Sequence, residues 1–364
     1  MSNREAARVT TVIPTFERAY VLGRAIASAA GQPGVRVRVC DNASADETPQ
    51  VVSSFREMGF DIEYFRHERN IGPAANFEFA VRGLSTPYFT ILSDDDYLVP
   101  GAITDAVHAL DQNPDAEFWV GTTINVGPDG RVWDARLDRW PRDGLYLPPE
   151  AALQMTAGRA PAWTGMVLRT RTIEEFGFID PEAKGPADLD FTLRLAMRYP
   201  FIVERRAAAV FSLNENTYSE SQPLSSFWPG WKKMFRNVQE ADGVDPATKR
   251  HLLRALHSDA RRMLFRRGAS AIARGRYEFA KDAAQVLGAE YGRHVRAFAL
   301  RMGARLAERS DGVARLLRWS YGRAEQRLVQ SRGDLEEKYS KFLQGGPGSA
   351  GQMGSRKTQD PAEL

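Results

Sequence analysis

Three consecutive aspartates are the first candidates for chemistry in this sequence of 364 residues. Asp94, Asp95 and Asp96 follow the apolar run PYFTIL and Ser93, and a stretch with helical periodicity comes next. Adjacent carboxylates repel one another and are costly to desolvate, so they need a compensating cation at the end of a buried strand. Mg²⁺ and Mn²⁺ prefer such oxygen ligands and commonly bridge one or two carboxylates to phosphates. The run therefore predicts a carboxylate metal site that holds a diphosphate.

Two further polar clusters follow apolar runs. PTFER comes after VTTVI, and DNAS comes after VRVRVC. Pro, Asp, Asn and Ser are common turn residues, so turn chemistry explains each cluster taken alone. Ligands of open parallel sheets, however, bind at the carboxyl ends of the strands. Three polar clusters at one sheet edge therefore favour a binding site.

Several other chemistries lack their motifs in this sequence. It has no G-x-x-x-x-G-K-[ST] phosphate loop, no G-x-G-x-x-G after the first strand and no G-x-S-x-G elbow. Its five histidines are scattered, and Cys40 is the single cysteine, so zinc spacing and an intramolecular disulfide are both excluded. Cys40 itself is expected to be a small buried hydrophobe.

The elements that position these clusters alternate between strand and helix patterns. We expect strands at residues 9–13, 35–40, 61–66, 87–92 and 116–126. We expect helices at residues 18–30, 44–58, 73–84 and 101–112, with Ser44 and Glu47 as a capping box for the second. This alternation predicts right-handed βαβ units and an α/β fold with a mostly parallel sheet.

The charge distribution divides the chain. Residues 1–226 contain 22 basic and 31 acidic residues, a net charge of −9, whereas residues 227–344 contain 25 and 13, a net charge of +12. The second part shows helical periodicity at 229–241, 246–272, 275–287, 290–307 and 312–342. We expect an acidic α/β domain over 1–226, a basic helical domain over 227–344 and a disordered polar tail over 345–364.

Four stretches in the first part resemble the nucleotide-sugar-binding half of family 2 glycosyltransferases with the GT-A fold. They are TTVIPTFERAYVLGRAIASA, VCDNASADET, RNIGPAANF and ILSDDDYLVPG, and their order and spacing match over about residues 9–104. The pattern continues less strongly to about residue 213, through WTGMVLRTRTIEEFGFID and GPADLDFTLRLAMRY. The resemblance implies an inverting, metal-dependent transfer of a sugar from a nucleoside diphosphate.

The resemblance implies a nucleotide pocket at the strand ends. Pro14, Thr15 and Glu17 match the loop that folds against the base, and Asp41 matches the aspartate that accepts a hydrogen bond from the pyrimidine N–H. The element that closes the pocket matches Asn70, Gly72 and Asn76, with Arg69 beside it able to reach a base or phosphate.

The aspartate run matches the D-x-D region of the family. Asp94 is implied as the ribose contact, and metal ligation is implied at Asp95 or Asp96. Many members read D-x-D-D here, and Ser93 replaces the first of those aspartates. The implied cofactor is Mn²⁺ or Mg²⁺.

The catalytic base of the family lies in a Glu-Asp pair before a helix. GPADLDF occupies this place, so Ala187 replaces the Glu and Asp188 matches the Asp, with Asp190 as the alternative base. Asp188 is equally typical of a helix start. A sugar or acceptor pocket is implied at Trp163, Thr164 and Gly165.

One family feature is replaced. FSLNENTYSES stands where members often carry an Arg- or His-bearing loop that helps to hold the diphosphate, and it contains neither residue. Phosphate neutralisation must then come from the metal or from elsewhere.

The basic helical part allows three interpretations. Its arginines suit a solvated face of packed helices, contact with an anionic membrane surface where a lipid-linked acceptor waits, or docking of a carrier-bound acceptor or a second copy. No nucleic-acid recognition motif is present. With no apolar run of about 18 residues and no secretory signal, we expect a cytoplasmic protein, with contact to the inner membrane face as the peripheral option.

The sequence thus predicts a glycosyltransferase of the hexosyltransferase class that uses a UDP- or dTDP-sugar. The acceptor is a hydroxyl or amine of a surface glycan or of a natural-product intermediate. A catalytically inactive sugar-nucleotide-binding scaffold is the alternative outside enzymes. A nucleotidyltransferase is the alternative within them, but PTFERAYVLGR lacks the glycine-rich loop that would hold a triphosphate.

Overall fold

The computed structural model describes residues 6–213 and 222–343. The tail expected to be disordered, and most of FSLNENTYSES, lie outside this range.

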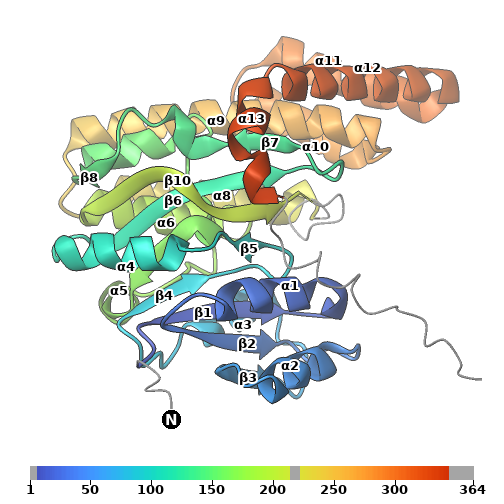
Figure 1. Cartoon of the computed structure of the whole chain (residues 1–364). Coiled ribbons are helices and arrows are strands. Elements are labelled where there is room, and N and C mark those ends of the chain that lie inside the picture. Colours follow the sequence, from blue (N-terminus) through green and yellow to red (C-terminus); the bar gives the residue numbers. More distant parts are fainter. Residues whose placement is uncertain (1–5, 214–221, 344–364) are drawn as a thin grey trace, which may run out of the picture.

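A single mixed sheet forms the centre of the molecule, in the order β3-β2-β1-β4-β9-β6-β10-β5, with β7 on β6 and β8 on β10 (Figure 1). Its strands are β1 Val9–Thr15, β2 Val35–Asp41, β3 Ile62–Arg66, β4 Tyr88–Ile91, β5 Tyr97–Leu98, β6 Phe118–Val126, β7 Val132–Ala135, β8 Gly144–Tyr146, β9 Met166–Arg169 and β10 Phe201–Ser212.

The front of the sheet is parallel, as the alternating pattern predicts. β1 pairs in parallel with β2 and β4, and β2 pairs in parallel with β3. β9 is inserted antiparallel between β4 and β6. This insertion brings the segment before β9 to the carboxyl end of β4, where the aspartates lie.

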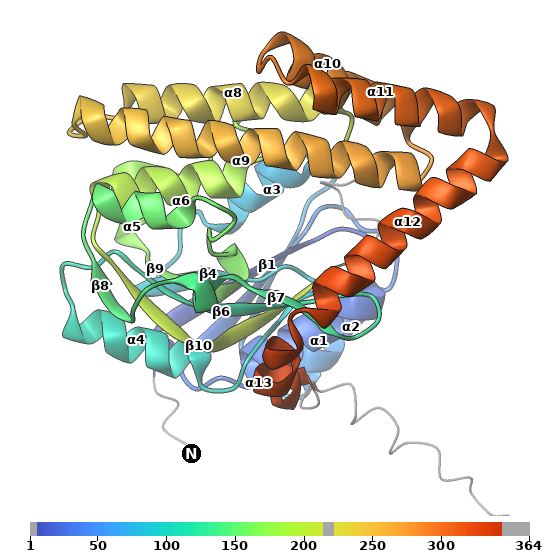
Figure 2. The same ribbon diagram turned by 90° about the horizontal axis from the view of Figure 1, so that it is seen from above.

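Helices cover both faces of the sheet (Figure 2). One face carries α1 Ala19–Ala30, α2 Thr48–Glu57 and α4 Ala102–Gln112, and the other carries α3 Pro73–Ala80, α5 Arg171–Phe176 and α6 Ala187–Arg198. β1 is buried along its whole length because both layers pack on it. Its apolar, β-branched composition suits this position.

The back part of the chain is helical, as predicted. It contains α8 Leu224–Glu240, α9 Pro246–Ala273, α10 Tyr277–Ala289, α11 His294–Arg309, α12 Asp311–Gln330 and α13 Gly333–Leu343. The prediction of one helix over 312–342 was wrong, because the chain breaks at Ser331 and Arg332. After the break, α13 packs on β7, with Tyr339 buried beside Val132.

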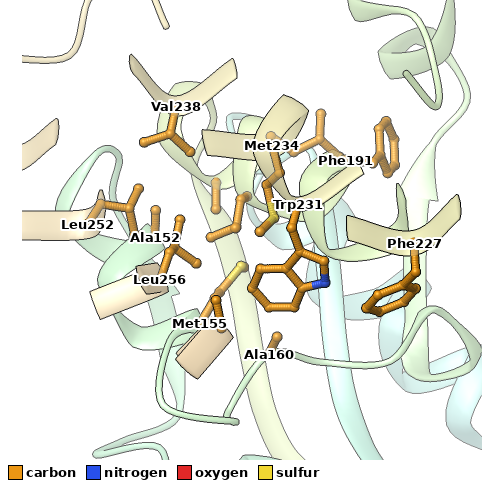
Figure 3. Close-up of a cluster of buried hydrophobic side chains, with 14 of the residues drawn as sticks. Ala152, Met155, Ala160, Phe191, Phe227, Trp231, Met234, Val238, Leu252 and Leu256 are labelled. Atoms are coloured by element: carbon orange, nitrogen blue, oxygen red, sulfur yellow. The ribbon is translucent and has the colours of Figure 1, made fainter. Parts of the chain in front are cut away.

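One buried cluster runs from the sheet into the back helices. Trp231 and Met234 of α8 pack among Met155, Phe191 and Leu256, which come from three other elements (Figure 3). The back helices are therefore packed directly on the α6 side of the sheet. Among the described residues, no helix is long and apolar enough to span a bilayer.

Candidate active site

The three polar clusters meet at the carboxyl ends of β1, β2 and β4. The backbone N–H of Asn42 donates to Thr15 O at 3.0 Å, and the Thr15 hydroxyl donates to Asp94 Oδ2 at 2.8 Å. The Glu17 N–H donates to the Ser44 hydroxyl at 2.8 Å, so Ser44 joins two loops. The predicted capping box is wrong, because α2 begins at Thr48 and the Ser44 hydroxyl accepts from Glu17 N–H instead.

Arg18 bridges the first two aspartates. Its Nη1 lies 2.7 Å from Asp94 Oδ1 and 3.0 Å from Asp95 Oδ2, and both carboxylates are nearly buried. Burial disfavours the charged guanidinium, but the two carboxylates outweigh it and raise the pKa of Arg18. Burial raises the pKa of Asp94, although Arg18 and Thr15 oppose that shift. The site thus already pairs these carboxylates with a cation.

Asp96 faces away from Arg18 and into the protein. Its Oδ2 accepts from the Thr164 hydroxyl at 2.7 Å, its Oδ1 accepts from the Ser212 N–H at 2.8 Å, and none of it is exposed. Burial, followed by the charge of Asp95, raises the pKa of Asp96 to about 8. Asp96 therefore ties the segment before β9 and the end of β10 to the aspartate turn.

Asp41 lies at the base of the expected nucleotide pocket. Its Oδ1 accepts from the Ser44 N–H at 2.8 Å and its Oδ2 from the Tyr64 hydroxyl at 2.6 Å, and Arg66 lies 3.6 Å from Oδ2. Burial and the bond to Asp41 raise the pKa of Tyr64. The carboxylate is held in one orientation at the end of β2, while Pro14 is buried in β1 beside it.

The two asparagines of the pocket-closing element have different surroundings. The Asn70 Oδ1 accepts from Asn42 Nδ2 at 2.9 Å and from the Gly72 N–H at 2.8 Å, which fixes the turn before α3. Asn76 is buried and donates to Cys40 O at 2.9 Å, so it fastens α3 to β2. Arg69 is exposed at the same edge.

Asp188 lies in the first turn of α6, and its side chain is exposed to solvent. Burial raises its pKa, whereas the Leu189 N–H at 2.8 Å and the charge of Arg136 oppose the rise. A carboxylate that water reaches and that protein partly desolvates is the arrangement a general base requires.

Asp190 is placed differently. It is fully buried, pairs with Arg194 at 2.8 Å and accepts from Asn237 of α8 at 2.9 Å. Burial raises the pKa of Asp190, opposed by Arg194 and Asn237. It joins α6 to the back helices.

Trp163, Thr164 and Gly165 form the short 3₁₀ helix before β9. The Trp163 Nε1 donates to Asp188 O at 3.3 Å, and its ring packs against Phe77 and Phe178. Gly165 is buried against β6, where a Cβ would lie 2.8 Å from Gly121 O and closer to Thr123. This segment therefore connects the aspartate turn to Asp188.

The sequence profile described as "Glycosyl transferase family 2" matches residues 10–163, which include the three polar clusters at the sheet edge. Residues 10–163 belong to glycosyl transferase family 2. The glycosyltransferase domain thus contains the nucleotide-side clusters and the segment up to Trp163, whereas Asp188 follows it.

Two curated relatives share part of this region. "GalNAc(5)-diNAcBac-PP-undecaprenol beta-1,3-glucosyltransferase" of Campylobacter jejuni is 31% identical over 100 residues, 27% of this chain and 32% of that protein. "Succinoglycan biosynthesis protein ExoU" of Rhizobium meliloti is 30% identical over 96 residues, 26% of this chain and 28% of that protein. The chain matches about a third of the length of each relative.

Solved structures resemble the fold over most of the chain. S. aureus TarS 1-349 in complex with UDP-GlcNAc is 18% identical, with 92% of each chain covered and a TM-score of 0.58. Mannosyltransferase PcManGT from Pyrobaculum calidifontis, in complex with GDP-Man and Mn²⁺, is 16% identical, with 97% and 89% covered and a TM-score of 0.51. The GT-A architecture and the helical C-terminal region are therefore those of known proteins.

Sequence reasoning missed two arginines of the glycosyltransferase domain. Arg18 is the only basic residue in the loop after β1, opposite three acidic residues, and this complementarity was a usable signal. Nothing in the sequence indicated that Arg136 lies near Asp188, because the irregular stretch around Arg136 has no periodicity from which its place in the fold could be predicted.

Proposed function

We propose that the protein is a glycosyltransferase that moves a sugar, with inversion, from a UDP- or dTDP-sugar to a hydroxyl or amine acceptor. The observation that carries the proposal is the cation-bridged pair of Asp94 and Asp95 at the sheet edge of a family 2 domain. The UDP-GlcNAc held by TarS and the GDP-Man held by PcManGT support a nucleotide-sugar donor.

The nucleotide is assigned to the ends of β1 and β2. Asp41, which is held by Ser44 and Tyr64, is the proposed acceptor for the N–H of a pyrimidine base, a donor that uracil and thymine share. Thr15, Glu17 and Asn70 border the same edge. This supports a pyrimidine nucleotide, and hence a UDP- or dTDP-sugar.

Asp188 is assigned as the base. It takes the proton of the acceptor hydroxyl or amine as that group attacks the anomeric carbon on the face opposite the nucleotide, which inverts the configuration. The full burial of Asp190, together with its two partners, argues for Asp188 over Asp190.

The residues present fit a divalent ion whose remaining ligands would come from the diphosphate. Among the described residues, no group of three or more His, Cys, Asp or Glu side chains could enclose a metal. Asp94 and Asp95 already share a cationic partner, and Mg²⁺ or Mn²⁺ sites at phosphates commonly use one or two carboxylates. Asp95 is the proposed protein ligand. A bound ion would neutralise the charge of the departing nucleoside diphosphate.

The acceptor is proposed to be a glycan on a lipid carrier at an anionic membrane surface. The printed name of the Campylobacter relative contains an undecaprenol diphosphate glycan, and the Rhizobium relative is a succinoglycan biosynthesis protein. Exposed arginines and apolar side chains on α11 and α12 suit such a surface.

Calorimetry of UDP binding with Mn²⁺ or with EDTA tests the donor site. We expect Mn²⁺-dependent binding in the wild type, its loss in Asp95→Ala, and its retention in Asp96→Asn, because the amide can keep both bonds of Asp96. Equal UDP binding by Asp95→Ala and the wild type would contradict the metal assignment.

Turnover separates an enzyme from an inactive scaffold. Donor hydrolysis, or transfer to lipid-linked glycans, should occur in the wild type and fall at least about 100-fold in Asp188→Asn, in line with the loss of a general base. Equal rates in both proteins would exclude Asp188 as the base, and no turnover despite UDP binding would favour the scaffold.

A further inference from the structure

Arg136 is a cation without an ion-pair partner in the described part of the chain. It opens the 3₁₀ helix Arg136–Arg139 directly after β7, and its side chain is half-buried. Its one hydrogen bond within that part runs from Nη1 to Ala160 O, at 3.2 Å. Five N–H donors on one guanidinium leave most of its binding capacity unused.

Within the described residues, neither of the two acidic residues whose charges act on Arg136 forms an ion pair with it. Asp134 pairs with Arg139 at 2.6 Å and lies 3.6 Å from Arg332. Asp188 acts on Arg136 through its charge but forms no ion pair with it among the described residues. Burial lowers the pKa of Arg136, and these carboxylates offset that only in part.

A second arginine adds to the positive charge. Arg266 of α9 is exposed, forms no ion pair within the described residues, and acts on Arg136 as a like charge. Two guanidinium groups that approach one another beside protein raise the electrostatic energy, unless an anion lies between them. The pair combines one residue of the front sheet region with one of the back helices.

This positive charge lies next to the candidate base. Arg136 holds the carbonyl of Ala160, and Trp163, three residues later, donates to the carbonyl of Asp188 at 3.3 Å. The Ala160–Trp163 segment thus contacts Arg136 at one end and Asp188 at the other, and the charges of the two residues act on each other. An anion bound by Arg136 would lie beside the reacting centre.

We propose that Arg136, assisted by Arg266, binds a phosphate group of a substrate beside Asp188. Arginine suits this role because its planar fork matches two phosphate oxygens at once. The site also provides a positive group that FSLNENTYSES lacks. Taking the proposed function as given, the phosphate belongs either to the donor diphosphate or to the acceptor.

Two calorimetric titrations distinguish these sources. The first compares UDP with uridine, both with Mn²⁺, in the wild type and in Arg136→Ala. The second titrates glycerol 3-phosphate, with glycerol as the neutral control, into protein in the presence of excess UDP and Mn²⁺. A donor phosphate predicts that UDP binding weakens about tenfold or more while uridine binding is unchanged. An acceptor phosphate predicts the same loss in the glycerol 3-phosphate titration alone.

Two variants serve as controls. Arg131→Ala removes an exposed arginine just before β7 and should bind both ligands like the wild type. Arg266→Ala changes an exposed helix position, so it tests the site without disturbing the fold, and it should weaken phosphate binding several-fold. Melting temperatures of all variants establish that they are folded.

The outcomes also separate this site from the proposed function. Phosphate binding that depends on Arg136 in a protein that binds no UDP would support the site and contradict the donor assignment. Unchanged UDP and glycerol 3-phosphate binding in both Arg136→Ala and Arg266→Ala would overturn the site. The site would also be overturned if Arg131→Ala lost binding to the same extent, or if the wild type bound neither UDP nor glycerol 3-phosphate.

Discussion

Each of the three consecutive aspartates has its own surroundings. Asp94 and Asp95 face the cationic Arg18, whereas Asp96 faces Thr164 and Ser212 inside the protein. The sequence predicted a charged site here because three acids follow a buried strand. It did not predict the division, because the partners of Asp96 are 68 and 116 residues away along the chain.

Arg18 should compete with a metal for the two carboxylates. In Arg18→Ala, two nearly buried charges lose their cation, so the free energy of unfolding in EDTA should fall by about 2 kcal/mol. Mn²⁺ should restore much of this loss and bind more tightly than to the wild type. Thermal melts with EDTA and with Mn²⁺, together with Mn²⁺ calorimetry, measure both effects.

Arg82→Ala is the matched control for Arg18→Ala. Arg82 forms an exposed ion pair with Glu78 on a helix surface, and such pairs contribute between 0 and about 1 kcal/mol. If Arg18→Ala melts like this control and binds Mn²⁺ no better than the wild type, the competition does not exist.

The raised pKa of Asp188 predicts the acid limb of the pH–rate profile. A base works only when deprotonated, so kcat/KM should fall as the pH drops through the pKa of Asp188, which lies above the usual 3.8. Because the Arg136 charge favours the ionised form, Arg136→Ala should raise this pKa further and shift the limb to higher pH. A limb at the same pH in both proteins would show that Arg136 does not act on Asp188.

At the scale of elements, regular periodicity made the front of the fold predictable. Each strand and helix expected between residues 9 and 126 is present, because apolar strands and amphipathic helices carry local signals. The antiparallel insertion of β9 between β4 and β6 was not expected. The pairing of a strand depends on tertiary contacts, which no local pattern encodes.

The contact of the Trp163–Gly165 segment with β6 should tolerate no added side chain. Gly165→Ala would place a Cβ against Thr123 and 2.8 Å from Gly121 O, so we expect a loss of about 1–3 kcal/mol from overpacking. Gly322→Ala is the control, since nothing lies within 4 Å of a Cβ there, and an alanine in α12 should stabilise by up to about 1 kcal/mol. Urea unfolding measures both, and equal stability of the two variants would contradict the tight contact.

At the scale of the whole molecule, the last of the back helices returns to pack against the front sheet. α12 runs from the end of α11 back toward the sheet, where α13 packs beside β7 (Figure 2). Lys338 and Tyr339 of α13 both bond to Asp138, at 2.9 and 2.6 Å. The charge division near residue 226 was visible in the sequence, but this return was not, because the direction of the chain after the break depends on the tertiary contacts of α13.

The outer surface of α11 and α12 has the composition of a membrane contact. Residues 294–330 contain eight arginines and three acidic residues. Large apolar side chains are exposed on the same helices, with Val295 84%, Phe298 65%, Leu316 60% and Trp319 59% accessible. Basic residues near an anionic bilayer contribute about 1 kcal/mol each, and apolar side chains add to this when they enter the interface.

We therefore expect the protein to co-sediment with vesicles rich in phosphatidylglycerol but not with phosphatidylcholine vesicles, and salt should weaken the binding. A Leu316→Glu, Trp319→Glu double variant should bind these vesicles at least about tenfold more weakly, because it replaces apolar contacts with charges that anionic lipid repels. Leu147→Glu, at a leucine 59% exposed elsewhere on the molecule, should bind like the wild type. Equal binding to both vesicle types, or an equal loss in Leu147→Glu, would assign these helices to a solvated face or to a protein partner instead. Binding by the double variant at wild-type strength would also show that these helices are not a membrane contact.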